Sequence, residues 1–161
     1  MIKFREIQVE DRLPLKQMLE ATKHFTEAEI EIALELVDHS TQKNDPSYQF
    51  IVVENSGGQF VGYGCWGQIP LTMGAYDIYW IAVSPELQGQ GVGSQILSFM
   101  EVEIMKTHGR LILIETSSSE VYQDTRAFYE KRGYVLESRI HDFYKSGDDR
   151  CIYVKRFDSF D

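Results

Sequence analysis

The segment Gln88–Ser94, with glycine at positions 89, 91 and 93, constrains the fold of this chain more than any other. It lies between a short apolar run, Ile78 to Val83, and an amphipathic run, Ser94 to Thr107. The first run is typical of a buried strand and the second of a helix. A glycine-rich turn at a helix start presents free backbone N–H groups and the positive end of the helix dipole, and glycine has no Cβ to keep an anion away. The sequence therefore predicts that this turn binds a phosphorylated ligand through its main chain.

Periodicity and turn signals predict seven strands and four helices in the order βααβββαβαββ. Thr26 and Glu29 form a capping box that begins the second helix, and residues 55–58 form a hairpin turn. The expected strands are 1–7, 48–54, 60–66, 77–84, 111–115, 134–140 and 151–156, and the expected helices are 15–22, 26–37, 94–107 and 121–132. A polar loop is expected between the last two strands. This order predicts a single α/β domain, residues 1–161, with one mixed and mostly antiparallel sheet.

Composition limits the possible partners. The net charge of −9 argues against nonspecific nucleic-acid binding, because a polyphosphate would be repelled, and it suits a cationic partner such as an amine. No apolar run approaches the roughly 20 residues that span a membrane. The start, Met1 to Glu6, alternates apolar and charged residues and lacks a signal-peptide core, which predicts a cytoplasmic protein. Cys65 and Cys151 lie in strand-like runs and are expected to be buried thiols, with no metal site.

Two familiar glycine-rich phosphate sites fit this turn poorly. The ATP-binding P-loop requires a lysine before its Ser or Thr, whereas Gly93 directly precedes Ser94. A dinucleotide site is closer, because Gly89, Gly91 and Ser94 loosely match its glycine pattern and Glu115 follows about 20 residues on. However, five residues separate the strand from the first glycine, and too few strand–helix units follow. A purely structural turn remains the other alternative.

Two linked motifs resemble one family. Gln88-x-x-Gly91-x-Gly93, preceded by Ile81-Ala82-Val83-Ser84-Pro85, resembles the coenzyme A pyrophosphate motif of the GCN5-related N-acetyltransferases. Downstream, Phe128-Tyr129-x-x-x-Gly133-Tyr134 is similar to a second motif of that family, in the same order and at about the same spacing. The resemblance covers nearly the whole chain, although residues 1 to 70 match only in pattern. It implies this family's fold and acetyl-coenzyme A as cosubstrate.

The resemblance also implies which residues hold the cofactor. Backbone N–H groups of the glycine turn would bind the pyrophosphate, and an N–H near Ile81 or Val83 would hold the thioester carbonyl. Lys131, near the end of the fourth helix, either reaches the cofactor's 3′-phosphate or complements the helix dipole. The full predicted set is Ile81, Ala82, Val83, Gln88, Gly89, Gln90, Gly91, Val92, Gly93, Ser94, Phe128 and Lys131.

The chemistry of amide formation needs a proton acceptor for the amine and a proton donor for the thiolate. Tyr129 is the predicted acid, because its hydroxyl stays protonated at neutral pH. Glu115 is the predicted base, with Glu54 and Asp77 as rivals that otherwise contact substrate. Asp142 and Tyr144, in the expected loop, would cover the acceptor. The sequence departs from the family pattern at Tyr122, where asparagine is frequent, and at Thr125, where alanine is.

The sequence thus predicts direct transfer of an acetyl group to a primary amine of a small molecule or a peptide, without a covalent enzyme intermediate. A non-catalytic sensor of acyl-coenzyme A is the alternative, since it would keep the glycine turn and need neither Tyr129 nor a base. The particular amine is left open. The terminal strands offer an edge for pairing two copies of the chain, so a homodimer is one possibility, and the oligomeric state is left open.

Overall fold

The structure is a computed structural model that describes residues 1–158, and these residues form two compact units. The first unit contains residues 1–68 and 78–104, and the second contains residues 69–77 and the chain from Met105 on. Strand β4 (Ala75–Val83) contributes residues to both units. Seven strands and four α-helices follow one another in the predicted order, and the hydrogen-bonded strand order is β1-β2-β3-β4-β5-β7-β6. The predicted α/β fold class is therefore confirmed.

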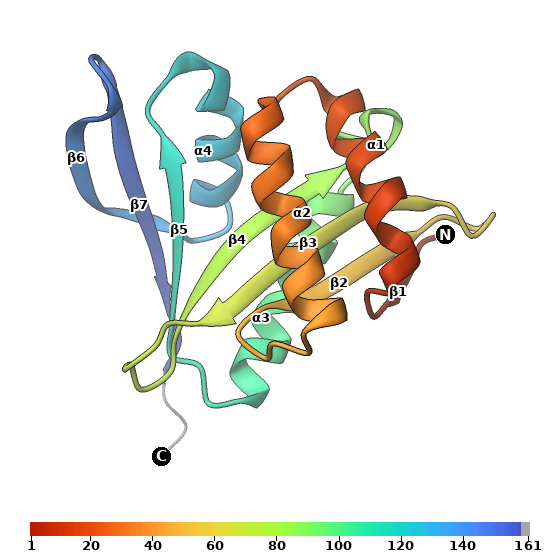
Figure 1. The fold of residues 1–161 in the computed structure, drawn as a ribbon. Helices are drawn as coiled ribbons and strands as arrows, with labels where there is room; N and C mark the ends of the chain where they lie inside the picture. Colours follow the sequence, from red (N-terminus) through yellow and green to blue (C-terminus); the bar gives the residue numbers. More distant parts are fainter. Residues whose placement is uncertain (159–161) are drawn as a thin grey trace. The chain divides into compact units, whose positions relative to one another are not determined.

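The first unit holds three helices and the strands on one side of the sheet. The strands are β1 (Lys3–Arg5), β2 (Gln49–Glu54), β3 (Phe60–Gln68) and the second half of β4, and the helices are α1 (Arg12–Thr22), α2 (Glu27–Gln42) and α3 (Val92–Lys106). β2 pairs antiparallel with both β1 and β3. α1 and α2 lie side by side on one face of these strands and α3 lies on the other (Figure 1).

Two local signals that were read from the sequence are present in this unit. Thr26 caps α2: the Glu29 N–H donates to the Thr26 Oγ1 at 3.2 Å, and the Thr26 N–H donates to the Glu29 Oε2 at 2.7 Å. The hairpin between β2 and β3 closes with the Asn55 N–H donating to the Gln59 carbonyl at 3.0 Å. Gly58 in that turn has φ +76°, a backbone conformation that glycine adopts without strain.

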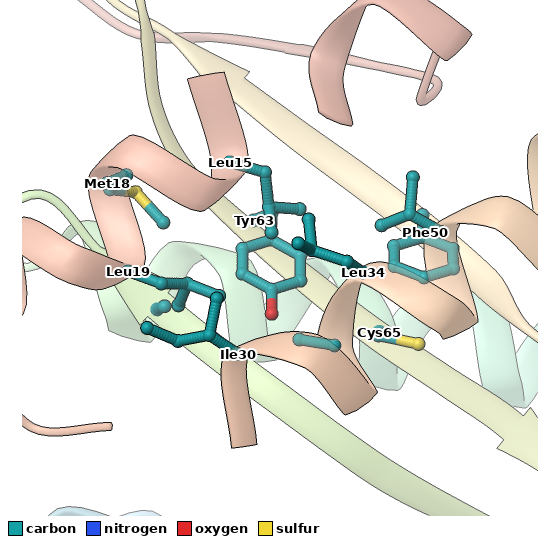
Figure 2. Packing of buried hydrophobic residues seen from close by; sticks show 11 residues of the cluster. Leu15, Met18, Leu19, Ile30, Leu34, Phe50, Tyr63 and Cys65 are labelled. Atoms are coloured by element: carbon teal, nitrogen blue, oxygen red, sulfur yellow. The ribbon is translucent and has the colours of Figure 1, made fainter. Parts of the chain in front are cut away.

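Alternating residues of β3 explain why helices can pack on both of its faces. A Cβ added at Gly64 would lie 2.7 Å from the Met100 Sδ of α3, so glycine lets α3 approach the strand closely. Tyr63 and Cys65 point to the opposite face, where they belong to one buried cluster with residues of α1 and α2. Figure 2 shows Tyr63 of β3 among Leu19 of α1 and Leu34 of α2. This packing holds the two surface helices on the strands that lead to the glycine turn.

The second unit contains the remaining strands and the last helix. They are the first half of β4, β5 (Leu111–Ser117), α4 (Gln123–Glu130), β6 (Val135–Lys145) and β7 (Asp148–Arg156). β5 runs parallel to β4 and antiparallel to β7, and β7 pairs antiparallel with β6. The sheet is therefore mixed and mostly antiparallel, as predicted. α4 packs through Tyr129, whose ring lies 5.7 Å from the ring of Tyr134.

The predicted polar loop between the last two strands is wrong. β6 continues to Lys145 and β7 begins at Asp148, so only residues 146 and 147 turn the chain. Besides the strand pairing, side chains of the two strands help to hold this long hairpin. The Asp142 N–H donates to the Asp149 Oδ1 at 2.9 Å, the Gly147 N–H donates to the Asp142 Oδ1 at 2.6 Å, and Arg139 forms an ion pair with Asp149 at 2.5 Å. The aspartates that suggested a loop instead satisfy backbone and guanidinium groups of the two strands.

Candidate functional site

The glycine turn precedes α3 in the first unit, as the sequence predicts. Gly91 caps the helix, because its carbonyl accepts from the Gln95 N–H at 3.1 Å, and the helix begins at Val92. Gly89 and Gly91 have φ values of +74° and +81°, and a Cβ added at either would meet nothing within 4 Å. The first N–H groups of an α-helix have no acceptor within the helix. The turn therefore combines open space with aimed donors, which suits a phosphate group.

Side chains within the turn brace it. The Gln88 Nε2 donates to the Val83 carbonyl at 3.1 Å, and the Gln90 Nε2 donates to the Glu86 carbonyl at 2.8 Å. Gln88 therefore ties the turn to the end of β4, and Gln90 ties it to the short 3-10 helix Pro85–Leu87 that follows the strand. A ligand at the turn would meet main-chain donors held in place, which lowers the cost of ordering them on binding.

The end of β4 leads into the turn. Ala82 is buried among residues of α1 and α2, whereas Ile81 and Val83, on the alternate face, are half-buried. The Ser84 N–H donates to the Val61 carbonyl at 2.8 Å, so the strand stays paired with β3 up to that point. The buried Ser84 hydroxyl has no hydrogen-bond partner within residues 1–158. An orphaned polar atom at the strand end is consistent with a ligand there.

In the second unit, α4 carries the aromatic pair that the sequence singled out. Tyr129 is buried, and burial raises the pKa of its hydroxyl above the ordinary value. Phe128 is half-buried and has the Arg132 guanidinium 3.7 Å from its ring centroid. Lys131 is exposed at the helix C-terminus. Tyr129 is thus held in its protonated form, while Arg132 is folded over Phe128.

Two of the predicted acids come together on neighbouring strands of the second unit. Asp77 of β4 is paired in register with Leu113 of β5, and Glu115 lies two residues further along β5. Side chains two residues apart on a strand share a face, so Asp77 and Glu115 project from the same face. Arg150 of β7 lies on that face too, and its Nη2 forms an ion pair with the Glu115 Oε1.

The two acids differ in their surroundings. Burial raises the pKa of Asp77 to about 6, with a further rise from the negative charge of Glu115 and an opposing effect of Arg150. Glu115 instead has its carboxylate engaged by Arg150. Burial and the charge of Glu115 also raise the pKa of Tyr144 of β6. Asp77, Glu115, Arg150 and Tyr144 therefore form one electrostatically linked group, which we call the acidic cluster.

Two other residues that were predicted to contact substrate, Glu54 and Asp142, bind groups of the protein itself. Glu54 forms an ion pair with Arg5 at 2.5 Å between its Oε1 and the Arg5 Nε, and Arg5 also binds Asp11 at 2.7 Å. Asp142 accepts from the turn of the β6–β7 hairpin and so lies outside the acidic cluster. A substrate role for either residue stays a prediction.

Sequence reasoning missed Arg150, which links Glu115 to Asp77. The apolar run predicts that the last strand begins at Cys151, which leaves Arg150 in the loop. The signal was present, because Arg150, Ile152 and Val154 continue the strand alternation backwards from the apolar run.

No helix within residues 1–158 is both long and apolar enough to cross a membrane. In that same range, no three His, Cys, Asp or Glu residues are grouped as a metal site would need.

A family model described as the acetyltransferase (GNAT) domain matches residues 46–136, which is more than half of the chain. The crystal structure of a GNAT-family protein from Desulfovibrio desulfuricans superimposes with a TM-score of 0.93 and 36% identity, covering 97% of this chain and 99% of that one. At that identity and coverage, the likeness indicates a shared family as well as a shared fold.

Two further proteins are similar at lower identity. The S-(2-succino)cysteine N-acetyltransferase of Bacillus subtilis is 27% identical over 70 residues, so the match spans 44% of this chain and 42% of that enzyme's length. The crystal structure of the PaiA N-acetyltransferase of Thermoplasma acidophilum in complex with coenzyme A has a TM-score of 0.74 and 17% identity, covering 98% of this chain and 99% of that one. The second likeness shows the fold alone.

Proposed function

Because this chain belongs to the GCN5-related N-acetyltransferase (GNAT) family, we propose that it transfers the acetyl group of acetyl-coenzyme A directly to a primary amine of a small molecule or a peptide, within a ternary complex. The observation that carries this proposal is the glycine turn at the start of α3. Gly89 and Gly91 leave open space beside the first N–H groups of the helix. We also propose that the two units form one catalytic domain, because β4 belongs to both.

The residues present fit coenzyme A. The N–H groups that follow Gly91 would hold its pyrophosphate, and the glutamine side chains that brace the turn would keep these donors aimed. Backbone N–H groups near Ile81 and Val83 would hold the thioester carbonyl, close to the orphaned Ser84 hydroxyl. Lys131 is exposed and would reach the 3′-phosphate. The Thermoplasma structure with bound coenzyme A supports this choice of ligand.

Asp77 is the group that we assign as proton acceptor. An ammonium has no lone pair, so the amine must lose a proton before it attacks. A carboxylate with a pKa of about 6 is ionised at pH 7 and is a stronger base than an ordinary aspartate. Glu115 remains the rival that the sequence favoured, but its ion pair with Arg150 suits it to a different task, which is to hold negative charge beside Asp77.

Bound acetyl-coenzyme A supplies an acyl carbon that is activated by a thiolate leaving group. The amine nitrogen forms a bond to that carbon while the carbon–sulfur bond breaks. Asp77 would take one proton from the ammonium before the attack, and the nitrogen would release its second proton once the carbon–nitrogen bond has formed. Tyr129 would donate its hydroxyl proton to the departing sulfur and regain a proton before the next turnover. A backbone N–H of β4 stabilises the negative charge that develops on the carbonyl oxygen. Burial keeps Tyr129 protonated, so the donor is ready at neutral pH.

A sensor of acyl-coenzyme A without catalysis is the alternative function. It needs the glycine turn only. The buried Tyr129 and the acidic cluster favour the enzyme, because a sensor gains nothing from a buried proton donor or from an aspartate of raised pKa.

Replacing Gly91 by valine should raise the Kd for coenzyme A at least tenfold. A β-branched residue at φ +81° strains the turn and places carbon atoms where the pyrophosphate would lie. Isothermal titration calorimetry with coenzyme A measures the change.

Gly58→Val is the matched control. Gly58 has φ +76° and open space around its Cβ position, but it lies in the β2–β3 hairpin. This variant should lose a similar amount of thermal stability and keep its affinity for coenzyme A. If the two variants bound coenzyme A with equal affinity, the glycine turn would not be the pyrophosphate site.

A further inference from the structure

β6 is irregular near its end in the second unit. Beyond Ile140, residues 141–144 of β6 lie opposite a single residue of β7, Asp149. Asp142, within this stretch, has φ +52°, a left-handed backbone conformation that favours glycine and that aspartate also adopts. Such a bulge changes the face of the sheet to which the following side chains point, and bulges are frequent next to active sites. We name residues 141–144 the β6 bulge.

The β6 bulge brings two aromatic side chains to the acidic cluster. Ile140 is paired with Arg150, so their side chains share a face, and a regular strand would turn Phe143 to the opposite face. Instead, the Phe143 ring centroid lies 5.0 Å from the guanidinium carbon of Arg150. The ring of Tyr144 lies 5.0 Å from that of Phe143, although neighbouring residues of a regular strand point apart. The bulge therefore places Phe143 against a charged member of the cluster.

The carboxylate of Asp149 holds the β6 bulge. Its Oδ1 accepts from the Asp142 N–H at 2.9 Å, and its Oδ2 accepts from the Arg139 Nε at 2.5 Å and lies 3.0 Å from the His141 Nδ1. Asp149 is only 5% exposed. The Asp142 N–H and the Arg139 guanidinium lower the pKa of its carboxyl to about 2, so the group is charged at neutral pH. A buried, charged acceptor thus fixes the backbone of the bulge.

The main chain of Asp149 is itself fixed by the loop that follows β5. The Asp149 N–H donates to the Ser118 Oγ at 2.8 Å, and the Asp149 carbonyl accepts from the Ser118 N–H at 2.9 Å. β5 also carries Glu115, the ion-pair partner of Arg150. The β6 bulge therefore cannot move relative to β5 unless the hydrogen bonds of Asp149 break.

Arg150 depends on these surroundings for its position. Its Nη2 pairs with Glu115 and its guanidinium faces the Phe143 ring, which attracts a cation. Its Nε is buried and has no hydrogen-bond partner within residues 1–158. A buried donor without a partner opposes this side-chain conformation, so neighbouring contacts must maintain it. The conformation matters for the site because the charge of Arg150 acts on Asp77.

We propose that Asp149 is a positioning residue that holds the β6 bulge and so keeps Phe143 against Arg150. Through that contact it fixes the arginine beside Glu115 and Asp77. The proposal rests on the proposed function for the role of Asp77 as base. The placement of Arg150, however, can be measured without any acetyl transfer.

The test follows the Arg150 Nε–H by NMR, as the signal that Arg150→Met lacks. In Asp149→Ala the exchange of this proton with water should become about tenfold faster, because the freed arginine reaches solvent. Asp149→Asn should stay close to wild type, since its amide oxygen still accepts from the Asp142 N–H. Phe143→Ala changes a half-exposed residue, so it should fold even if Asp149→Ala does not. It should also accelerate the exchange.

Asp11→Ala is the matched control. Asp11 is also 5% exposed, accepts from the Gln8 N–H at 2.8 Å and pairs with Arg5 at 2.7 Å, but it belongs to the first unit. This variant should lose thermal stability and leave the exchange of the Arg150 proton unchanged. Unchanged exchange in Phe143→Ala and Asp149→Ala, or equal acceleration in Asp11→Ala, would overturn the proposal.

A pH profile separates this proposal from the proposed function. Glu115 of β5 and Arg150 of β7 are the charged groups that act on Asp77, and Tyr144 of β6 is the further titratable group beside them. In Asp149→Ala the fall of activity at low pH should move to higher pH, as in Arg150→Met. It should move no further in the double variant, because both changes act through one charge.

The other outcomes are distinct. A shift to lower pH in Asp149→Ala would mean that Asp77 had become better solvated, and it would overturn the proposal. If no amine is acetylated, faster exchange of the Arg150 proton in Asp149→Ala still supports the positioning role, and only the assignment of Asp77 fails.

Discussion

Replacing Asp77 by asparagine should lower kcat/KM for the acceptor amine about 100-fold at pH 7.5, which corresponds to roughly 2.7 kcal/mol of transition-state stabilisation. The amide keeps the shape of the side chain but cannot accept the amine proton. Wild-type activity should fall as the pH drops through about 6, because that is where Asp77 takes up a proton. This fall of activity at low pH is the acidic limb of the pH profile, and the variant should not show it. A pH profile of kcat/KM, measured with thiol release as the readout, records both effects.

Neighbouring charges should move this limb in opposite directions. Glu115→Gln removes the negative charge that helps to raise the pKa of Asp77, so the limb should shift to lower pH. Arg150→Met removes the opposing positive charge, so the limb should shift to higher pH. Asp124→Asn, an exposed position on α4, should change nothing. If Asp77→Asn kept the acidic limb while Glu115→Gln lost it, Glu115 would be the base.

Replacing Tyr129 by phenylalanine should lower kcat at least tenfold and leave the affinity for coenzyme A nearly unchanged. The ring stays in place, so the buried contact with Tyr134 survives. Only the proton donor disappears, and the thiolate must then depart unprotonated. A tenfold loss corresponds to about 1.4 kcal/mol in the barrier. Steady-state kinetics give kcat, and calorimetry gives the Kd for coenzyme A.

The neighbouring ring provides the control for Tyr129. Tyr134 is also buried and in ring contact, so Tyr134→Phe removes a hydroxyl from the same cluster without removing the assigned acid. Its kcat should stay within twofold of wild type. Similar losses in the two variants would mean that packing, rather than proton donation, explains the effect of Tyr129.

Much of the fold could be read from local signals, because they are encoded in few residues. The capping box of Thr26 and Glu29, the β2–β3 hairpin and the positive φ of the turn glycines all follow from short-range chemistry. The β6–β7 hairpin could not be read in this way. Its aspartates bind groups of the partner strand, so a pattern that looks like a solvated loop is in fact held by cross-strand hydrogen bonds.

The candidate site likewise contains residues that local sequence predicts and residues that only strand pairing brings together. The glycine turn, its flanking strand and helix, and the buried Tyr129 were found from sequence because each depends on local pattern or motif. The relation between Asp77, Glu115 and Arg150 depends on strand register across β4, β5 and β7, which no single segment encodes. For that reason the sequence offered several carboxylates as base, whereas only strand pairing shows which one is buried beside a second charge.

The most direct test of the account is acetyl transfer itself. Wild-type protein is incubated with acetyl-coenzyme A and a library of primary amines, and both free thiol and acetylated amine are quantified. The account predicts that at least one amine is acetylated with one thiol released per product, and that Asp77→Asn slows this reaction while still binding coenzyme A. Tight binding of acetyl-coenzyme A with no amine-dependent thiol release above the uncatalysed rate would contradict it and make the protein a sensor.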